Sequence, residues 1–170
     1  IFTNIGDAHQ ENFSSPGQKA GEKLLLFRKA KKLVYCADQE DLKVQAERFC
    51  DEHSVQKISW SLKGNRAFVS FFAETFENFT KIKANVNNKE YHFKIPFTDH
   101  SSLENACHCF AASYVLQENI ARVLPRFEKL EPVAMRLEIK RGINNCLLIN
   151  DYYNSDLHSL TIALSVLQQQ

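Results

Sequence analysis

Two groups of residues in this sequence have side chains suited to chemistry. The first is His9, which follows an apolar run broken by Gly6, together with Lys23. The second is the polar loop at residues 149–156, which leads from an apolar run toward a helical pattern. A strand end followed by polar residues and a helix N-terminus is a common ligand-binding arrangement, although capping explains Ser155 or Asp156 equally well. A lysine on a helix is usually solvated, and an isolated histidine is commonly a core or surface residue.

The elements around His9 and Lys23 can be predicted from local patterns. Residues 1–6 are expected to form a buried strand that delivers polar side chains to its exit, where parallel sheets usually place their sites. Ser15 can cap a helix that has Pro16 at its first position. We expect this helix to span residues 15–30, with Lys23 beside its apolar stripe.

The rest of the chain predicts an α/β fold with a change of pattern near residue 130. Expected strands lie at residues 32–36 and 56–62, around a helix that Asp38 caps and that ends near His53. An antiparallel meander is predicted next, and two helices follow it. We expect one domain at residues 1–130 and the start of another at residues 131–170. The latter should hold two strands around Gly142, and a helix with aligned leucines at Leu157, Leu160, Leu164 and Leu167.

Composition narrows the functional classes. The chain has 170 residues, 44% of them hydrophobic, and a formal net charge of +1, so bulk charge points to neither nucleic acid nor an anionic membrane. No apolar run approaches the ~18 residues needed to span a bilayer. Five cysteines are an odd number in apolar segments, which predicts buried free thiols and a cytoplasmic protein: Cys36, Cys50, Cys107, Cys109 and Cys146.

Three other patterns are weaker candidates for a site. The run Cys107-His108-Cys109 cannot converge on one ion, because successive helical residues point about 100° apart. The basic residues 28–32 are explained as a solvated helix end. No glycine-rich phosphate loop is present, and the chain begins without methionine inside an apolar run. We therefore expect a segment cut from a longer protein.

The residues at 3–13, Thr-Asn-Ile-Gly-Asp-Ala-His-Gln-Glu-Asn-Phe, resemble the strand-and-loop segment in the ATP-binding central domain of Mur ligases. The similarity continues at Glu22-Lys23 and at Leu103-Glu104-Asn105-Ala106. Beyond residue 130 it includes Met135-Arg136-Leu137-Glu138 and the run Leu-Ile-Asn-Asp-Tyr-Tyr-Asn-Ser at residues 148–155. The pattern is most similar to the ligases that join D-alanyl-D-alanine to UDP-N-acetylmuramoyl-tripeptide.

The sequence also departs from the family pattern. Ser101-Ser102 replaces a His-Asn pair of the family, Met135 replaces a glycine, and Asn150 replaces the first of two aspartates. Asp151 is therefore the stronger of the two candidates in that loop. The Phe-Thr-Asp and Glu-Asn-Ala variants are similar to the ligase halves of bifunctional ligase/alanine racemase chains.

The resemblance implies a set of site residues. Lys23 would be the lysine that reacts with carbon dioxide to form a carbamate, and His9 would be a second ligand to the same Mg²⁺. Arg136 would stabilise the transferring phosphate of ATP. Asn105 would contact adenine, and the third-domain loop would hold the nucleotide through Asp151, Tyr153 and Asn154. A hinge near residue 130 would close this domain over the central one.

The implied fold is the C-terminal portion of a Mur ligase central domain, with parallel strands, an antiparallel meander and helices, followed by the start of a Rossmann-like C-terminal domain. The phosphate loop would lie upstream of Ile1, so this chain alone is expected to be inactive. Two alternatives stay open. One is a binding module of the same architecture without chemistry, and the other is a ligase similar to folylpolyglutamate synthetase.

Overall fold

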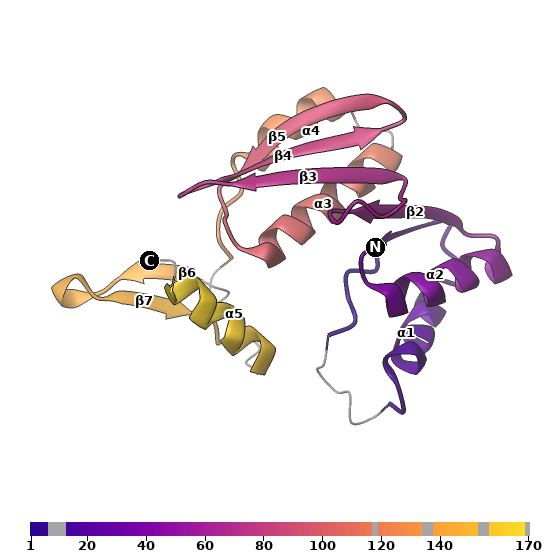
Figure 1. Ribbon diagram of the computed structural model, residues 1–170, viewed down its shortest axis with the longest axis horizontal. Helices are drawn as coiled ribbons and strands as arrows, with labels where there is room; N and C mark the ends of the chain where they lie inside the picture. Colours follow the sequence, from indigo (N-terminus) through magenta and orange to yellow (C-terminus); the bar gives the residue numbers. More distant parts are fainter. Residues whose placement is uncertain (7–12, 117–118, 134–137, 153–156, 169–170) are drawn as a thin grey trace. The chain divides into compact units, whose positions relative to one another are not determined.

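The computed structural model describes residues 1–6, 13–116, 119–133, 138–152 and 157–168. The chain divides into two compact units, Ile1–Lys129 and Leu130–Gln170. The first unit contains a five-stranded sheet with helices, and the second contains a two-stranded sheet and one helix (Figure 1). That the second unit begins a C-terminal ligase domain stays a prediction.

The sheet of the first unit is mixed, with its strands in sequence order: β1 (Lys32–Cys36), β2 (Gln56–Ser61), β3 (Val69–Thr75), β4 (Thr80–Val86) and β5 (Lys89–Ile95). The first three strands run parallel, and the last three form an antiparallel meander. Phe2 adds a parallel bridge to Tyr35 at the outer side of β1. The predicted strands at residues 32–36 and 56–62 and the meander are therefore confirmed, whereas the strand expected at residues 1–6 is only this single bridge.

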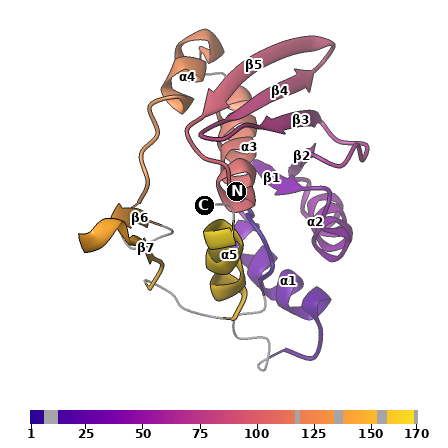
Figure 2. The same ribbon diagram turned by 60° about the vertical axis from the view of Figure 1, so that its left-hand side comes forward.

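Alternating side chains of β1 divide the core of this unit into two clusters. Leu33 and Tyr35 face the helices α1 (Pro16–Leu24) and α2 (Glu40–His53), together with Phe2. Val34 and Cys36 face the opposite side, which is covered by α3 (His100–Val115) and α4 (Ile120–Phe127). Figure 2 shows α2 and α3 on opposite sides of β1. A strand buried on both faces explains why residues 33–36 carry no charged side chain.

Helix α1 begins as predicted and ends earlier. The Ser15 hydroxyl accepts the Gln18 backbone N–H at 3.1 Å, and Pro16 is the first helical residue. The helix ends at Leu24, where the Leu25 N–H bonds to nearer carbonyls and a 3₁₀ turn, η2 (Leu25–Phe27), follows. Tightening of this last turn ends the helix, so the prediction that it reaches residue 30 is wrong.

Helix α2 corrects the prediction for Asp38. Its N-cap is Gln39, and the Asp38 carboxylate binds the loop after β2 instead. The predicted apolar stripe of this helix is buried: Leu42, Ala46, Phe49 and Cys50. The helix ends at Ser54, which has the left-handed conformation that is typical of a helix C-terminus (φ 55°).

Helices α3 and α4 pack their aromatic side chains against the meander. Phe110 is fully buried and lies against Phe71, Tyr91 and Phe93, while Phe93 also contacts Phe127 of α4. Pro125 lies inside α4, as the sequence predicted. The cysteines are all free, but Cys109 and Cys146 are exposed, so the expectation of five buried thiols holds for only three.

The second unit is a hairpin followed by a helix. Strands β6 (Glu138–Arg141) and β7 (Leu147–Asn150) pair antiparallel, joined through Gly142 and the short turn η3 (Ile143–Asn145). Helix α5 (Leu157–Gln168) includes the predicted leucines. Three of them, Leu160, Leu164 and Leu167, are about half exposed. Among the described helices, none is long and apolar enough to cross a membrane.

Candidate functional site

Three of the chain segments that leave the sheet at the carboxyl ends of its parallel strands and bridge are considered as one edge. They follow Phe2, β1 and β2. The register pairs Cys36 with Trp60, so β1 and β2 end side by side. Ligands of α/β proteins usually bind at this edge of the sheet. We call these three segments the carboxyl edge and build the candidate site from them.

Asp38 organises the part of the carboxyl edge between β1 and β2. Its carboxylate accepts hydrogen bonds from the Ser61 hydroxyl at 2.5 Å, from the Leu62 backbone N–H at 2.7 Å and from the Asn65 amide at 2.9 Å. Burial alone would raise the pKa of this carboxyl, but the hydrogen bonds together lower it below its ordinary value. Asp38 therefore stays ionised and fixes the loop after β2.

His108 of α3 ties this helix to two segments of the edge. The indole N–H of Trp60 donates to His108 Nδ1 at 2.9 Å, and His108 Nε2 lies 3.1 Å from the Thr3 carbonyl oxygen. Because Nδ1 accepts, Nε2 carries the proton and donates it to Thr3. Burial lowers the pKa of His108 to about 4, so the ring is neutral at pH 7. Both ring nitrogens are engaged within the protein.

Asn105 lies one turn before His108 on α3 and is exposed. Residues three apart on a helix are neighbours on its surface, which places Asn105 close to the carboxyl edge. Its neighbour Glu104 also acts on the end of β1: burial first, and then the charges of Asp38 and Glu104, raise the pKa of the Cys36 thiol to about 11. An exposed amide at this position is free to meet a ligand at the edge.

Lys23 is exposed on α1, beside the buried residues Ala20 and Leu24. Helix α1 follows the segment that leaves the sheet after Phe2, and it packs against α2. One turn earlier on the same helix, Lys19 is only 1% exposed. Of the two lysines, Lys23 is the one whose amine is open to a small molecule from solvent.

The other predicted site residues divide into two groups. His9, Arg136, Tyr153 and Asn154 lie outside the described residues. Asp151 follows β7 in the second unit and is half-buried. The sequence did not predict the burial of Lys19 or the hydrogen bonds of His108. It predicted Asp38 as the N-cap of the helix that is α2. A polar residue directly after a strand was the available signal for Asp38, whereas nothing in the sequence marks Lys19 as buried.

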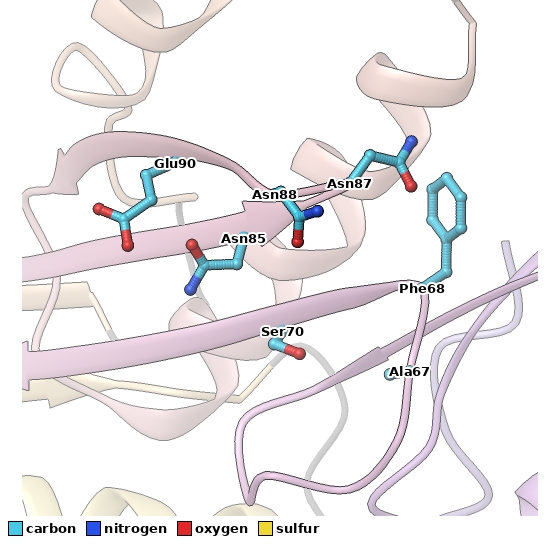
Figure 3. A pocket seen from close by; sticks show the side chains of 7 residues that line it. All are labelled: Ala67, Phe68, Ser70, Asn85, Asn87, Asn88 and Glu90. Atoms are coloured by element: carbon cyan, nitrogen blue, oxygen red, sulfur yellow. The ribbon is translucent and has the colours of Figure 1, made fainter.

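A hollow of about 650 Å³ lies elsewhere, on the face of β3, β4 and β5 opposite α3. Figure 3 shows its lining, which is Ala67, Phe68, Ser70, Asn85, Asn87, Asn88 and Glu90. Glu90 is already paired with Lys83 at 3.0 Å. None of the predicted site residues lines this hollow.

The described residues offer few ligands for Mg²⁺. Across the described ranges, no group of three His, Cys, Asp or Glu side chains is placed to hold a metal ion. Mg²⁺ requires oxygen ligands, which an exposed Lys23 supplies only after it becomes a carbamate. The described residues therefore form no Mg²⁺ site by themselves, and the roles of Lys23 and His9 as ligands stay predictions.

The fold is that of an α/β domain whose parallel strands β1 and β2 end side by side at the carboxyl edge. The chain matches the model of the Mur ligase middle domain over residues 1–113, and it belongs to this family. Most of the chain is therefore a Mur ligase middle domain.

Solved structures share the fold. MurF from Acinetobacter baumannii is similar over 99% of this chain, with a TM-score of 0.82 and 21% identity. MurF from Thermotoga maritima, determined in complex with ADP, is similar over 98% of this chain, with a TM-score of 0.73 and 16% identity. A mutant of FPGS from L. casei is similar over 97% of this chain, with a TM-score of 0.73 and 13% identity. The chain spans 36%, 38% and 40% of those three chains, respectively.

Proposed function

We propose that this chain is part of an ATP-dependent amide ligase of peptidoglycan synthesis, which adds D-alanyl-D-alanine to UDP-N-acetylmuramoyl-tripeptide. The observation that carries the proposal is the family match over residues 1–113, which includes the run at residues 3–13 and the exposed Lys23. The similarity to two MurF structures supports the choice within the family. The enzyme would work in the cytoplasm.

The proposed reaction has two steps. The tripeptide carboxylate attacks the γ-phosphate of ATP, which forms an acyl phosphate and releases ADP. The amine of D-alanyl-D-alanine then displaces inorganic phosphate and forms the amide. Arg136 would stabilise charge on the transferring phosphate, and Asn105 would contact adenine. The loop after β7 would hold the nucleotide through Asp151, Tyr153 and Asn154.

Lys23 and His9 would hold Mg²⁺, which neutralises the phosphate oxygens when bound. The neutral Lys23 amine reacts with carbon dioxide, forms a carbamate and loses one proton. The exposed position of Lys23 leaves that amine accessible. The carbamate changes a cation, which would repel the metal, into an oxygen ligand that Mg²⁺ prefers.

The sequence contains no glycine-rich loop that could bind the phosphates of ATP. The proposed enzyme would therefore need a phosphate loop from outside this chain. We expect the 170-residue chain alone to neither hydrolyse ATP nor ligate peptides. A fused alanine racemase is a further prediction that rests only on the sequence variants around Asp99 and Asn105.

The test is ligation by the longer protein that carries this chain. Release of phosphate should require ATP, UDP-N-acetylmuramoyl-tripeptide and D-alanyl-D-alanine together, measured by a coupled phosphate assay with product identified by mass. Lys23→Ala should lower kcat/KM by roughly a hundredfold or more, as for loss of a group that stabilises transition-state charge. Lys29→Ala, an exposed lysine nearby, is the matched control and should leave the rate unchanged.

FPGS similarity supports a second candidate, a ligase that adds glutamate to a folate-type acceptor. The same assay separates the two, because the second candidate would release phosphate with glutamate and folate and not with D-alanyl-D-alanine. Absence of phosphate release with either substrate pair would contradict both and favour a non-catalytic binding module.

A further inference from the structure

The hollow on the outer face of β3, β4 and β5 contains none of the residues proposed for the ligase site. It measures about 650 Å³, and small-molecule sites usually measure about 300–1,000 Å³. All of its lining residues are described, and all belong to the first unit. Such sites usually have a mainly apolar lining, but five of the seven lining residues here are polar. The polar groups therefore decide what kind of molecule fits the hollow.

The register of the meander places three polar side chains in one row across the sheet. Ser70 of β3 pairs with Asn85 of β4, and Asn85 pairs with Glu90 of β5 (Figure 3). Residues directly opposite each other on antiparallel strands have their Cβ atoms about 4.5–5.5 Å apart on one face of the sheet. The preceding residues Val69 and Ala84 point into the core under α3, so this row points away from it. The strands thus hold a hydroxyl, an amide and a carboxylate side by side.

The turn between β4 and β5 adds an amide that the backbone does not require. Asn87 and Asn88 connect the paired residues Val86 and Lys89, and they have positive φ values of 49° and 61°. Two-residue turns of this kind favour glycine at the second position, because glycine adopts positive φ without steric cost. Asn88 occupies that position, and its side chain lines the hollow. The chain therefore keeps a polar side chain where the turn alone favours none.

Most of the polar side chains in the hollow are free to bind a ligand. Four of them make no hydrogen bond to another described residue: Ser70, Asn85, Asn87 and Asn88. Glu90 is the one charged residue in the described lining, and its carboxylate accepts the Lys83 ammonium at 3.0 Å. This ion pair leaves the hollow without net charge.

These groups argue against three classes of ligand. An anion such as phosphate would meet no lysine or arginine in the described lining, and a cation would compete with Lys83 for Glu90. An apolar ligand would remove water from the amides without replacing their hydrogen bonds. Amides and hydroxyls both donate and accept hydrogen bonds. The lining therefore suits a neutral ligand with several hydroxyl groups.

Phe68 gives the hollow an aromatic wall beside these polar groups. The Phe68 side chain is half-buried, and its ring packs edge-on against Tyr114 of α3, with the ring centroids 6.1 Å apart. The contact with Tyr114 holds the ring in place. A sugar ring has hydroxyl groups around its rim and C–H groups on its faces, so it can meet the amides and the aromatic ring together.

We propose that this hollow is a binding site for a neutral sugar, with its hydroxyl groups bound by Ser70, Asn85 and Asn88 and a C–H face packed against Phe68. The Glu90 carboxylate keeps lone pairs that can accept a further hydroxyl while it stays paired with Lys83. The inference does not rest on the proposed function, because the two sets of residues do not overlap.

The site is tested by NMR on the isotope-labelled 170-residue chain, to which the methyl glycosides of glucose, galactose and mannose are added in turn. We expect at least one glycoside to shift the side-chain amide signals of Asn85 and Asn88 in a saturable way. Glucose 6-phosphate is the charged comparison, and it should bind less tightly because no free cation lines the hollow. Tighter binding of glucose 6-phosphate would overturn the proposal, and so would the absence of a saturable shift with all three glycosides.

Two variants locate the binding. Asn88→Gly should raise the Kd of the bound glycoside about fivefold, as for the loss of one or two hydrogen bonds. Glycine suits the turn, so this variant should keep the urea midpoint of the original chain. Asn78→Gly is the matched control, because Asn78 is exposed in the connection between β3 and β4 and lies outside the lining. Asn85→Ala should also weaken binding, and an unchanged Kd in both Asn88→Gly and Asn85→Ala would overturn the proposal.

Discussion

At the scale of single residues, the carboxyl edge is held by polar side chains whose hydrogen-bonding groups are all used. Asp38 binds the loop after β2, and His108 binds Trp60 and Thr3. Throughout the described ranges, no buried side-chain nitrogen or oxygen lacks a hydrogen-bond partner. Such groups stabilise one arrangement of the edge, because breaking any of these bonds leaves a desolvated partner. The hydrogen bonds of Asp38 and His108 therefore hold the carboxyl edge in one arrangement.

His108 gives this part of the fold a dependence on pH. Its pKa in the folded chain is about 4, below the ordinary value of 6.5, mainly because burial disfavours the charged ring. The unfolded chain therefore takes up the proton first as the pH falls. Stability from neutral His108 is complete above about pH 6.5 and is lost progressively toward pH 4, by at most about 3 kcal/mol.

This dependence is measured by urea unfolding of the 170-residue chain at several pH values between 7 and 4. His108→Gln should be less stable than the original chain at pH 7 and should lose less stability on acidification. His92→Gln is the control, because His92 is exposed and should keep the original pH dependence. Equal slopes in the original chain and in His108→Gln would contradict the assignment to His108.

At the scale of elements, local patterns predicted most of the fold. The run at residues 32–36, uncharged after Lys32, forms β1 at the expected positions, and the meander follows as expected. Local pattern failed where a tertiary contact decides the outcome. Aspartate is a common N-cap residue, but the Asp38 carboxylate binds the Ser61 hydroxyl and the Leu62 N–H instead. Likewise, helical periodicity could not show that α1 tightens after Leu24.

The candidate site was predicted less completely than the fold. The resemblance selected Lys23 and Asn105, which are exposed on α1 and α3, respectively. It gave no indication of the residues beneath them, because burial of a lysine or pairing of a histidine with a tryptophan depends on contacts between distant segments. Trp60 and His108 illustrate this, since their hydrogen bond joins β2 to α3.

The N-terminus of α1 gives a prediction at the element scale. Ser15 is the N-cap, and its hydroxyl accepts the Gln18 N–H. Ser15→Ala leaves that donor without its partner and should lower the free energy of unfolding by about 1 kcal/mol. Ser14→Ala is a matched control, since only the backbone N–H of Ser14 takes part in the described contact with Gln18. Urea unfolding that finds equal losses for the two variants would contradict the capping role.

At the scale of the whole molecule, the two units differ in how much apolar surface they bury. The first unit has two core clusters on either side of β1. In the second unit, by contrast, no described hydrophobic side chain is buried, and Ile143, Leu148 and Leu160 are at least half exposed. A two-stranded hairpin is at best marginally stable in water, and very small units rarely form a sufficient core.

This contrast predicts separate folding behaviour. A chain of residues 1–129 should unfold cooperatively in urea with a midpoint close to that of the 170-residue chain, because both core clusters lie within it. A peptide of residues 130–170 should show no cooperative transition by circular dichroism, since its apolar side chains have too little to pack against. A cooperative transition in that peptide would show that the second unit folds by itself.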